Sequence, residues 1–144
     1  MIHPTHCALC KKQAMLVESH ILPAFVFRWK KKTSATGYLR SNKNPNKRVQ
    51  DGLTVQMLCI QCEALFNGFE TPFSRHVFHP FVSGKTATAP YGPWLLKFCV
   101  SVSWRILSFS HRGDGLANWS DHHQARAKAA LEGWGAFLLG QKEH

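Results

Sequence analysis

Two pairs of cysteines constrain the fold of this chain more than any other sequence feature. Cys7 and Cys10 form a Cys-x-x-Cys pair near the start, and Cys59 and Cys62 form a second pair after a gap of 48 residues. A Cys-x-x-Cys turn places both thiolates on one side, and two such turns complete the tetrahedral four-sulfur site of structural zinc. The spacing therefore predicts one zinc ion bound by all four residues. Coincidence or a redox role is the alternative, but no thioredoxin-like pattern surrounds either pair.

The size and charge of the chain bear on its organisation and its partner. A length of 144 residues suits a single domain, 1–144, and a hydrophobic content of 44% is enough to form a core. The 18 Lys and Arg residues exceed the 8 Asp and Glu residues, which gives a net charge of +10. This balance favours a polyanionic partner; a basic protein without such a partner is the alternative.

Neither a secretory signal nor a membrane span is predicted. The first residues, MIHPTHCALCKK, contain no apolar signal region. The longest apolar stretch, 94–109, is shorter than the ~20 residues that a bilayer requires and contains Lys97 and Arg105. We therefore expect a cytoplasmic protein with reduced cysteines. Cys99 lies within that apolar stretch and is expected to be a small buried hydrophobic residue.

Apolar patterning in the first half predicts two strands and a helix. Residues 14–20 are short and half apolar, typical of a strand that ends before Pro23, and residues 53–58 would form its hairpin partner. The intervening sequence is rich in Ser, Asn and Gly and predicts an irregular basic loop. Apolar residues at helical spacing predict a helix from Glu63 onward. Pro72, with Pro80 after it, then indicates a mostly irregular stretch.

The second half is predicted to be mostly helical. Apolar residues recur at helical intervals over 95–109, directly after Pro93, which suits the first turn of a helix. Alternation of apolar residues over 100–106 favours a strand instead, and we predict the helix. A final amphipathic helix would begin at a cap provided by Ser120 or Asn118. Its apolar face comprises Ala127, Ala130, Leu131, Trp134 and Leu138.

Three segments together resemble a known family. They are CALC at 7–10, SHILP at 19–23 and MLCIQCEALF at 57–66. The order of these features resembles the zinc-stapled HNH endonucleases, also called His-Me finger or ββα-metal enzymes. That order is a cysteine pair, a histidine at a strand end, a loop, and then a strand that runs into a second cysteine pair and a helix. The resemblance spans Cys7 to Phe69. It implies an α+β fold with an HNH-like ββα-metal core at 7–70. The composition and periodicity described above add a basic loop at 28–50 and a mostly helical C-terminal part at 90–144, which we expect to pack on the core.

The resemblance also implies catalytic residues. In this family the histidine at the end of the first strand is the general base, which is His20 here. A single divalent cation, Mg²⁺ or Mn²⁺, would act at the scissile phosphate, with Glu63 and Asp51 as its ligands. Many members have Asp or His directly before the base, where this chain has Ser19, a weaker ligand. Glu70 is a reserve candidate on the same predicted helix.

DNA is the substrate that the resemblance implies, and RNA is the alternative. Hydrolysis of its phosphodiester bonds would show weak sequence preference, because phosphate contacts do not read bases. Phage-encoded nucleases and bacterial defence or toxin systems are the implied setting. The residues expected to contact phosphates are Lys11, Lys12, Arg28, Lys30, Lys31, Lys32, Arg40, Lys43, Lys47 and Arg48.

Other interpretations of the sequence remain open. A zinc module without catalysis, in which Ser19 marks a lost active site, would bind nucleic acid or an acidic protein. A protein partner could also bind the apolar C-terminal half. His76 and His79 could bind a metal or a phosphate, although we expect them to be packed or surface residues.

Overall fold

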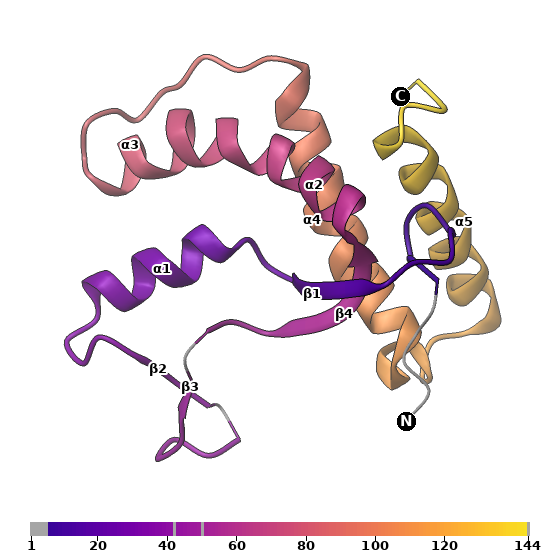
Figure 1. Ribbon diagram of the computed structural model, residues 1–144, viewed down its shortest axis with the longest axis horizontal. Coiled ribbons are helices and arrows are strands. Elements are labelled where there is room, and N and C mark those ends of the chain that lie inside the picture. Colours follow the sequence, from indigo (N-terminus) through magenta and orange to yellow (C-terminus); the bar gives the residue numbers. More distant parts are fainter. Residues whose placement is uncertain (1–5, 42, 50, 144) are drawn as a thin grey trace.

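The computed structural model describes residues 6–41, 43–49 and 51–143. At its centre, strand β1 (Leu16–His20) pairs antiparallel with strand β4 (Thr54–Cys59), and helix α2 (Ile60–Phe73) follows β4 directly (Figure 1). The mixed α+β class, the strand pair and the helix at the second cysteine pair are confirmed. Because α2 begins at Ile60, Cys62 belongs to its first turn rather than preceding it.

The pairing of β1 with β4 turns one face of the strand pair into the core. Leu16 pairs with Cys59 and His20 pairs with Thr54, with a bulge between residues 17 and 18. Side chains alternate between the two faces of a strand. Ser19 is fully buried, so its neighbour His20 turns to the opposite, more accessible face.

The segment between β1 and β4 contains more regular structure than predicted. Helix α1 (Ala24–Thr33) begins directly after Pro23, and strands β2 (Leu39–Arg40) and β3 (Arg48–Val49) form a second small antiparallel sheet. The predicted irregular basic loop at 28–50 is therefore wrong for the residues in these elements, and residues 42 and 50 lie outside the described residues. The α1 helix packs through Phe25 against a distant aromatic ring, a contact that local sequence patterns do not reveal.

The helical path continues through Pro72, so the predicted irregular stretch is also wrong. Pro72 lies inside α2, which passes into a π-helical turn, η1 (Ser74–Phe78), and then into helix α3 (His79–Val82). Proline removes one helical hydrogen bond, and a wider π turn is one way in which a helix accommodates a local irregularity. Stacking of Phe73 on Phe98, with ring centroids 4.0 Å apart, holds this segment against the next helix.

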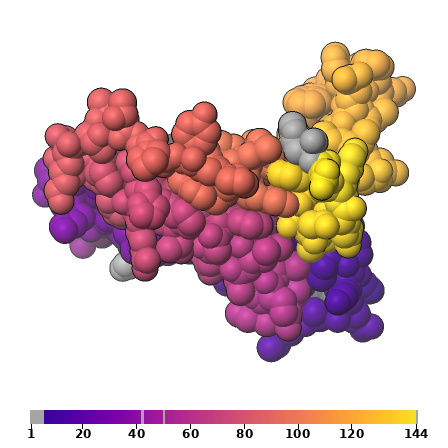
Figure 2. Space-filling model, turned by 90° about the horizontal axis from the view of Figure 1, so that it is seen from above, coloured from indigo at the N-terminus to yellow at the C-terminus, as the bar shows by residue number. Residues whose placement is uncertain are grey.

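Two long helices form the C-terminal half and confirm its prediction. Helix α4 (Pro93–Arg112) has proline in its first turn, and a short 3₁₀ helix, η2 (Asp114–Leu116), leads to helix α5 (Asp121–Leu138). Ser120 caps α5, because its hydroxyl accepts a hydrogen bond from the backbone N–H of His123. Seen from above, the first turns of α5 project away from the rest of the molecule (Figure 2).

The core lies where α2, α4 and α5 meet beside the strand pair. Trp104 of α4 is buried, packs edge-on against Phe66 at 5.8 Å between centroids, and donates a hydrogen bond from Nε1 to the Leu131 carbonyl. Cys99 lies on the outer face of α4 and is exposed, so the prediction of a buried Cys99 is wrong. Within the described ranges, no helix combines the length and apolar character needed to cross a membrane.

Candidate metal centre and candidate active site

The two cysteine pairs converge on one point. The sulfur atoms of Cys7, Cys10, Cys59 and Cys62 all lie within 4.8 Å of one another. The Sγ atoms of Cys10 and Cys59 are 3.8 Å apart. Tetrahedral zinc with Zn–S bonds of about 2.3 Å separates its sulfur ligands by about 3.8 Å. The four cysteines are therefore positioned to bind one metal ion, and zinc fits this donor set.

Two backbone turns build the cluster. In the first, the Cys7 N–H donates to the Lys12 carbonyl, and Lys11 adopts a positive φ of 63°. The Ala8 N–H donates to the Met57 carbonyl at 2.9 Å and so attaches this turn to β4. The second turn is the junction of β4 with α2. Backbone hydrogen bonds therefore place the two pairs beside each other before any metal is considered.

The thiols of the cluster differ in acidity. Burial raises the pKa of Cys7, but hydrogen bonds from the backbone of Cys59, Cys10 and Leu9 outweigh burial and lower this pKa to about 7. Burial raises the pKa of Cys62, and the neighbouring thiols raise it further. Crowded thiols of this kind do not all ionise unless a cation lies between them. A divalent metal supplies that charge and deprotonates its thiol ligands.

His20 and Asp51 form a close pair on the accessible face of the strands. His20 Nε2 lies 3.0 Å from Asp51 Oδ2, and the two side chains are 21% and 48% exposed. Burial raises the pKa of Asp51, but the Gly52 N–H, the His20 imidazole and the charge of Lys31 together lower it below its ordinary value. An ionised carboxylate beside an imidazole orients the ring and stabilises its protonated form. This geometry suits a histidine that accepts a proton.

Packing of α1 holds this pair in place. The Phe27 ring stacks near the His20 ring at 6.4 Å between centroids. The same phenyl ring lies against Gly52, where an added Cβ would be 2.1 Å from a ring carbon. A larger residue after Asp51 would therefore displace the Phe27 ring from this position. Neither Phe27 nor Gly52 was predicted to be part of the site, and the Asp-Gly dipeptide was the available signal for the latter.

Glu63, Asn67 and Glu70 form a polar stripe along α2. Their spacing of four and then three residues places them on one face of the helix. Glu63 Oε2 is buried and has no hydrogen-bond partner, so this oxygen is available to a cation. Among the described residues, no hydrogen bond or ion pair joins Glu63 to His20 or Asp51. The structure thus brings two of the three predicted catalytic residues into contact and leaves Glu63 on the neighbouring helix.

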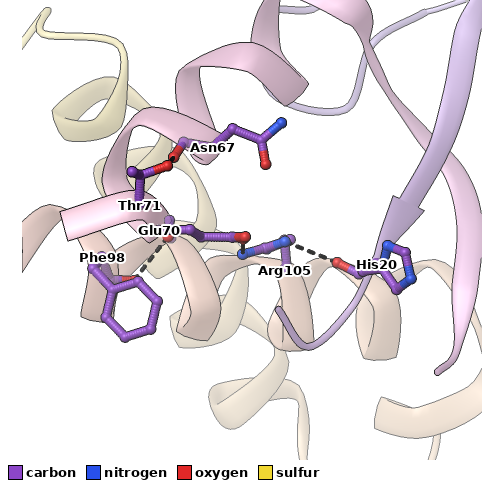
Figure 3. A network of polar contacts seen from close by, with 7 residues as sticks. His20, Asn67, Glu70, Thr71, Phe98 and Arg105 are labelled. Atoms are coloured by element: carbon purple, nitrogen blue, oxygen red, sulfur yellow. Dashed lines mark hydrogen bonds and ion pairs between the residues drawn. The ribbon is translucent and has the colours of Figure 1, made fainter. Parts of the chain in front are cut away.

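Arg105 connects the polar stripe to the end of β1 (Figure 3). This α4 side chain is 1% exposed, forms an ion pair with Glu70, and donates a hydrogen bond from Nη1 to the His20 carbonyl oxygen at 2.9 Å. In Figure 3 the Asn67 and Glu70 side chains extend from α2 toward the side where His20 lies. Glu70, the reserve candidate for a cation ligand, is thus the partner of an arginine. In the sequence, Arg105 is recognisable only as a charge in an apolar stretch.

Ser19 does not share the site with His20. Its side chain is fully buried, and its hydroxyl donates a hydrogen bond to the Val17 carbonyl at 3.4 Å. Strand alternation directs it into the core, away from the face that carries His20. The interpretation of Ser19 as a weak cation ligand is therefore wrong.

The predicted phosphate-contacting residues fall in three places. Lys11 and Lys12 lie at the first cysteine turn, where Lys11 Nζ donates to the Ala8 carbonyl. The helix α1 carries Arg28, Lys30, Lys31 and Lys32. The β2–β3 segment carries Arg40, Lys43, Lys47 and Arg48. Two of these arginines contact the Tyr38 ring, Arg40 at 5.5 Å and Arg48 at 4.3 Å.

Comparisons with known proteins give no relative from which a role could be transferred. No family model matches the sequence, and neither the curated proteins nor the solved structures contain a match. The function of the site must be inferred from its own geometry.

We expect the purified chain to contain about one zinc ion per molecule. Replacing Cys62→Ser should release the metal and unfold the chain, because a structural zinc site contributes its binding free energy to folding. Cys99→Ser is the matched control, since this cysteine is exposed and outside the cluster. Elemental analysis and circular dichroism measure both effects. A Cys62→Ser protein that stays folded with full zinc content would contradict the metal centre.

We expect Arg105→Met to lower the free energy of unfolding by about 3–5 kcal/mol, because it leaves the Glu70 carboxylate buried without its partner. The double variant Arg105→Met/Glu70→Leu should recover much of that loss, since both charges are then removed. Urea unfolding of the three proteins measures the difference. Equal stability of the wild type and Arg105→Met would show that the ion pair does not hold α2 against α4.

Proposed function

We propose that this chain is a metal-dependent endonuclease of the HNH type that hydrolyses phosphodiester bonds in DNA. The observation that carries the proposal is the His20–Asp51 pair, with 3.0 Å between Nε2 and Oδ2. His20 lies at the end of β1 and Asp51 lies in the bend before β4, while the four-cysteine cluster lies at the other end of this strand pair. Rigid elements of this kind favour proton transfer, because they keep the base in one orientation.

In this proposal His20 is the general base. Its neutral imidazole accepts a proton from water while the water oxygen bonds to phosphorus and the bond from phosphorus to the leaving oxygen breaks. Asp51 stabilises the imidazolium that results, and its lowered pKa keeps it ionised at neutral pH.

Two carboxylates, Glu63 and Asp51, are the ligands that we propose for a divalent cation. Glu63 is the leading ligand because its buried Oε2 has no other partner, and the half-exposed Asp51 carboxylate is the second. Asn67 follows Glu63 by one helical turn and adds an amide oxygen on the same face. A bound Mg²⁺ or Mn²⁺ would offset negative charge on the phosphate and the departing oxygen.

The charge of the chain supports a nucleic-acid substrate. The net charge is +10, and the exposed cations of α1 follow His20 closely in the sequence. Lys and Arg contacts to phosphates provide affinity by releasing counterions and do not discriminate between bases. We therefore propose weak sequence preference.

The test is nicking of supercoiled plasmid DNA with Mg²⁺ or Mn²⁺. His20→Ala should lower the rate by about 10²- to 10⁴-fold, because it removes the base, while zinc content and DNA affinity stay unchanged. His122→Ala is the matched control, since this exposed histidine lies on α5. If His20→Ala cleaves as fast as the wild type, the base is elsewhere.

A zinc module that binds nucleic acid or an acidic protein without catalysis is the second candidate. The buried position of Ser19 and the ion pair of Glu70 with Arg105 favour it, because both leave fewer oxygen ligands for a cation. A wild-type protein that binds DNA and leaves the plasmid intact with both metals would establish this function and exclude the endonuclease.

A further inference from the structure

A groove between α1 and the α3 region contains several cations and no acidic residue. Its volume is about 600 Å³, and neither Asp nor Glu is among its lining residues. Both views place α1 and the α3 region at the same end of the molecule (Figures 1 and 2). The charged or aromatic side chains that line the groove are Arg28, Trp29, Lys32, Arg75, His79 and Lys85. Arg75 and Lys85 were not among the predicted phosphate-contacting residues, and phosphate binding by His79 was only an alternative.

Aromatic packing fixes the two walls of the groove. Trp29 of α1 packs edge-on against Phe78 with centroids 5.6 Å apart, and Phe25 contacts the same ring at 4.9 Å. These rings hold α1 against the η1–α3 segment, so Arg28, Lys32 and Arg75 are carried on packed helical elements. Lys85 lies in the bend after α3, where its N–H donates to the Pro80 carbonyl. An aromatic side chain set among cations is typical of surfaces that bind a nucleic-acid strand.

The groove adjoins a second, smaller depression between α1 and α2. This depression has a volume of about 210 Å³ and shares Arg28 and Arg75 with the groove. Glu70 lines it as well, and Arg105 joins Glu70 to the His20 carbonyl. The ion pair with Arg105 offsets the one carboxylate along this path. Arg28 and Arg75, which line both depressions, therefore extend the positive surface from the groove toward α2.

We propose that this groove binds the sugar-phosphate backbone of the DNA strand on one side of the cleavage site, with phosphate contacts from Arg28, Lys32, Arg75 and Lys85. Arg28 and Lys32 lie one turn apart on α1, about 6 Å along its axis, so their long side chains reach different positions on one strand. The location of the cleavage site rests on the proposed function, whereas DNA binding in the groove does not.

The experiment measures DNA binding in a His20→Ala background, which separates affinity from cleavage. The groove variant carries Arg75→Glu and Lys85→Glu, and the matched control carries Lys128→Glu and Lys142→Glu at exposed positions on α5 and after it. Both variants exchange two positive charges for two negative charges, so their net charges are equal. Fluorescence anisotropy with a short labelled duplex, repeated over a range of NaCl concentrations without divalent cations, gives affinity and salt dependence.

The groove variant should bind DNA at least about tenfold more weakly than the background protein. The slope of log K against log salt concentration should become less negative by about 1.8, because two phosphate contacts are lost. The affinity of the control variant for DNA should fall by less than about threefold, because salt screens charges that do not contact the DNA. The milder double variant Arg75→Gln/Lys85→Gln should show a smaller loss of DNA affinity. It replaces the groove variant in the comparison if charge reversal disturbs folding.

Equal losses in the groove variant and the control would overturn the proposal, because net charge alone would then explain binding. Binding of an RNA duplex or of polyglutamate with no binding of DNA would overturn it as well. If only the groove variant loses DNA affinity and the wild type leaves plasmid intact, the groove proposal stands and the endonuclease proposal fails.

Discussion

The four-cysteine cluster is the constraint on which the rest of this structure depends. It joins the turn after Cys7 to the point where β4 passes into α2, and three of its cysteines are at most 4% exposed within the core. Because β1 follows the first turn and β4 precedes the second, a metal at this point ties the strand pair at one end. At the opposite end of β1, the His20 side chain then lies beside Asp51.

Arg105 makes the C-terminal half part of the candidate active site. It holds the main chain of His20 from α4 and neutralises Glu70 on α2, so three elements far apart in the sequence converge on one guanidinium. Burial of a charged pair contributes little net stability compared with an apolar pair, but loss of one partner is costly. The arrangement therefore favours one relative placement of α2, α4 and β1, and it extends the candidate site from the N-terminal half into α4.

Local patterns in the sequence predicted the elements whose signals are local. Cysteine spacing located the metal cluster, and Pro93 and Ser120 marked the starts of α4 and α5. The patterns failed where distant contacts decide the outcome. Packing of Phe25 against Phe78 accompanies a helix after Pro23, and stacking of Phe73 on Phe98 accompanies a helical path through Pro72. The partners of Arg105 are 35 and 85 positions away, a separation that no periodicity reveals.

X-ray absorption spectroscopy at the zinc edge of the purified chain tests the central claim most directly. The cluster predicts four sulfur neighbours at about 2.3 Å and no lighter ligand. A spectrum with nitrogen or oxygen neighbours at about 2.0–2.1 Å, or a folded protein with no zinc edge, would contradict the four-sulfur site. Either result would mean that the backbone hydrogen bond from Ala8 to Met57 and the packing around it hold the first cysteine turn against β4 without a four-sulfur metal site.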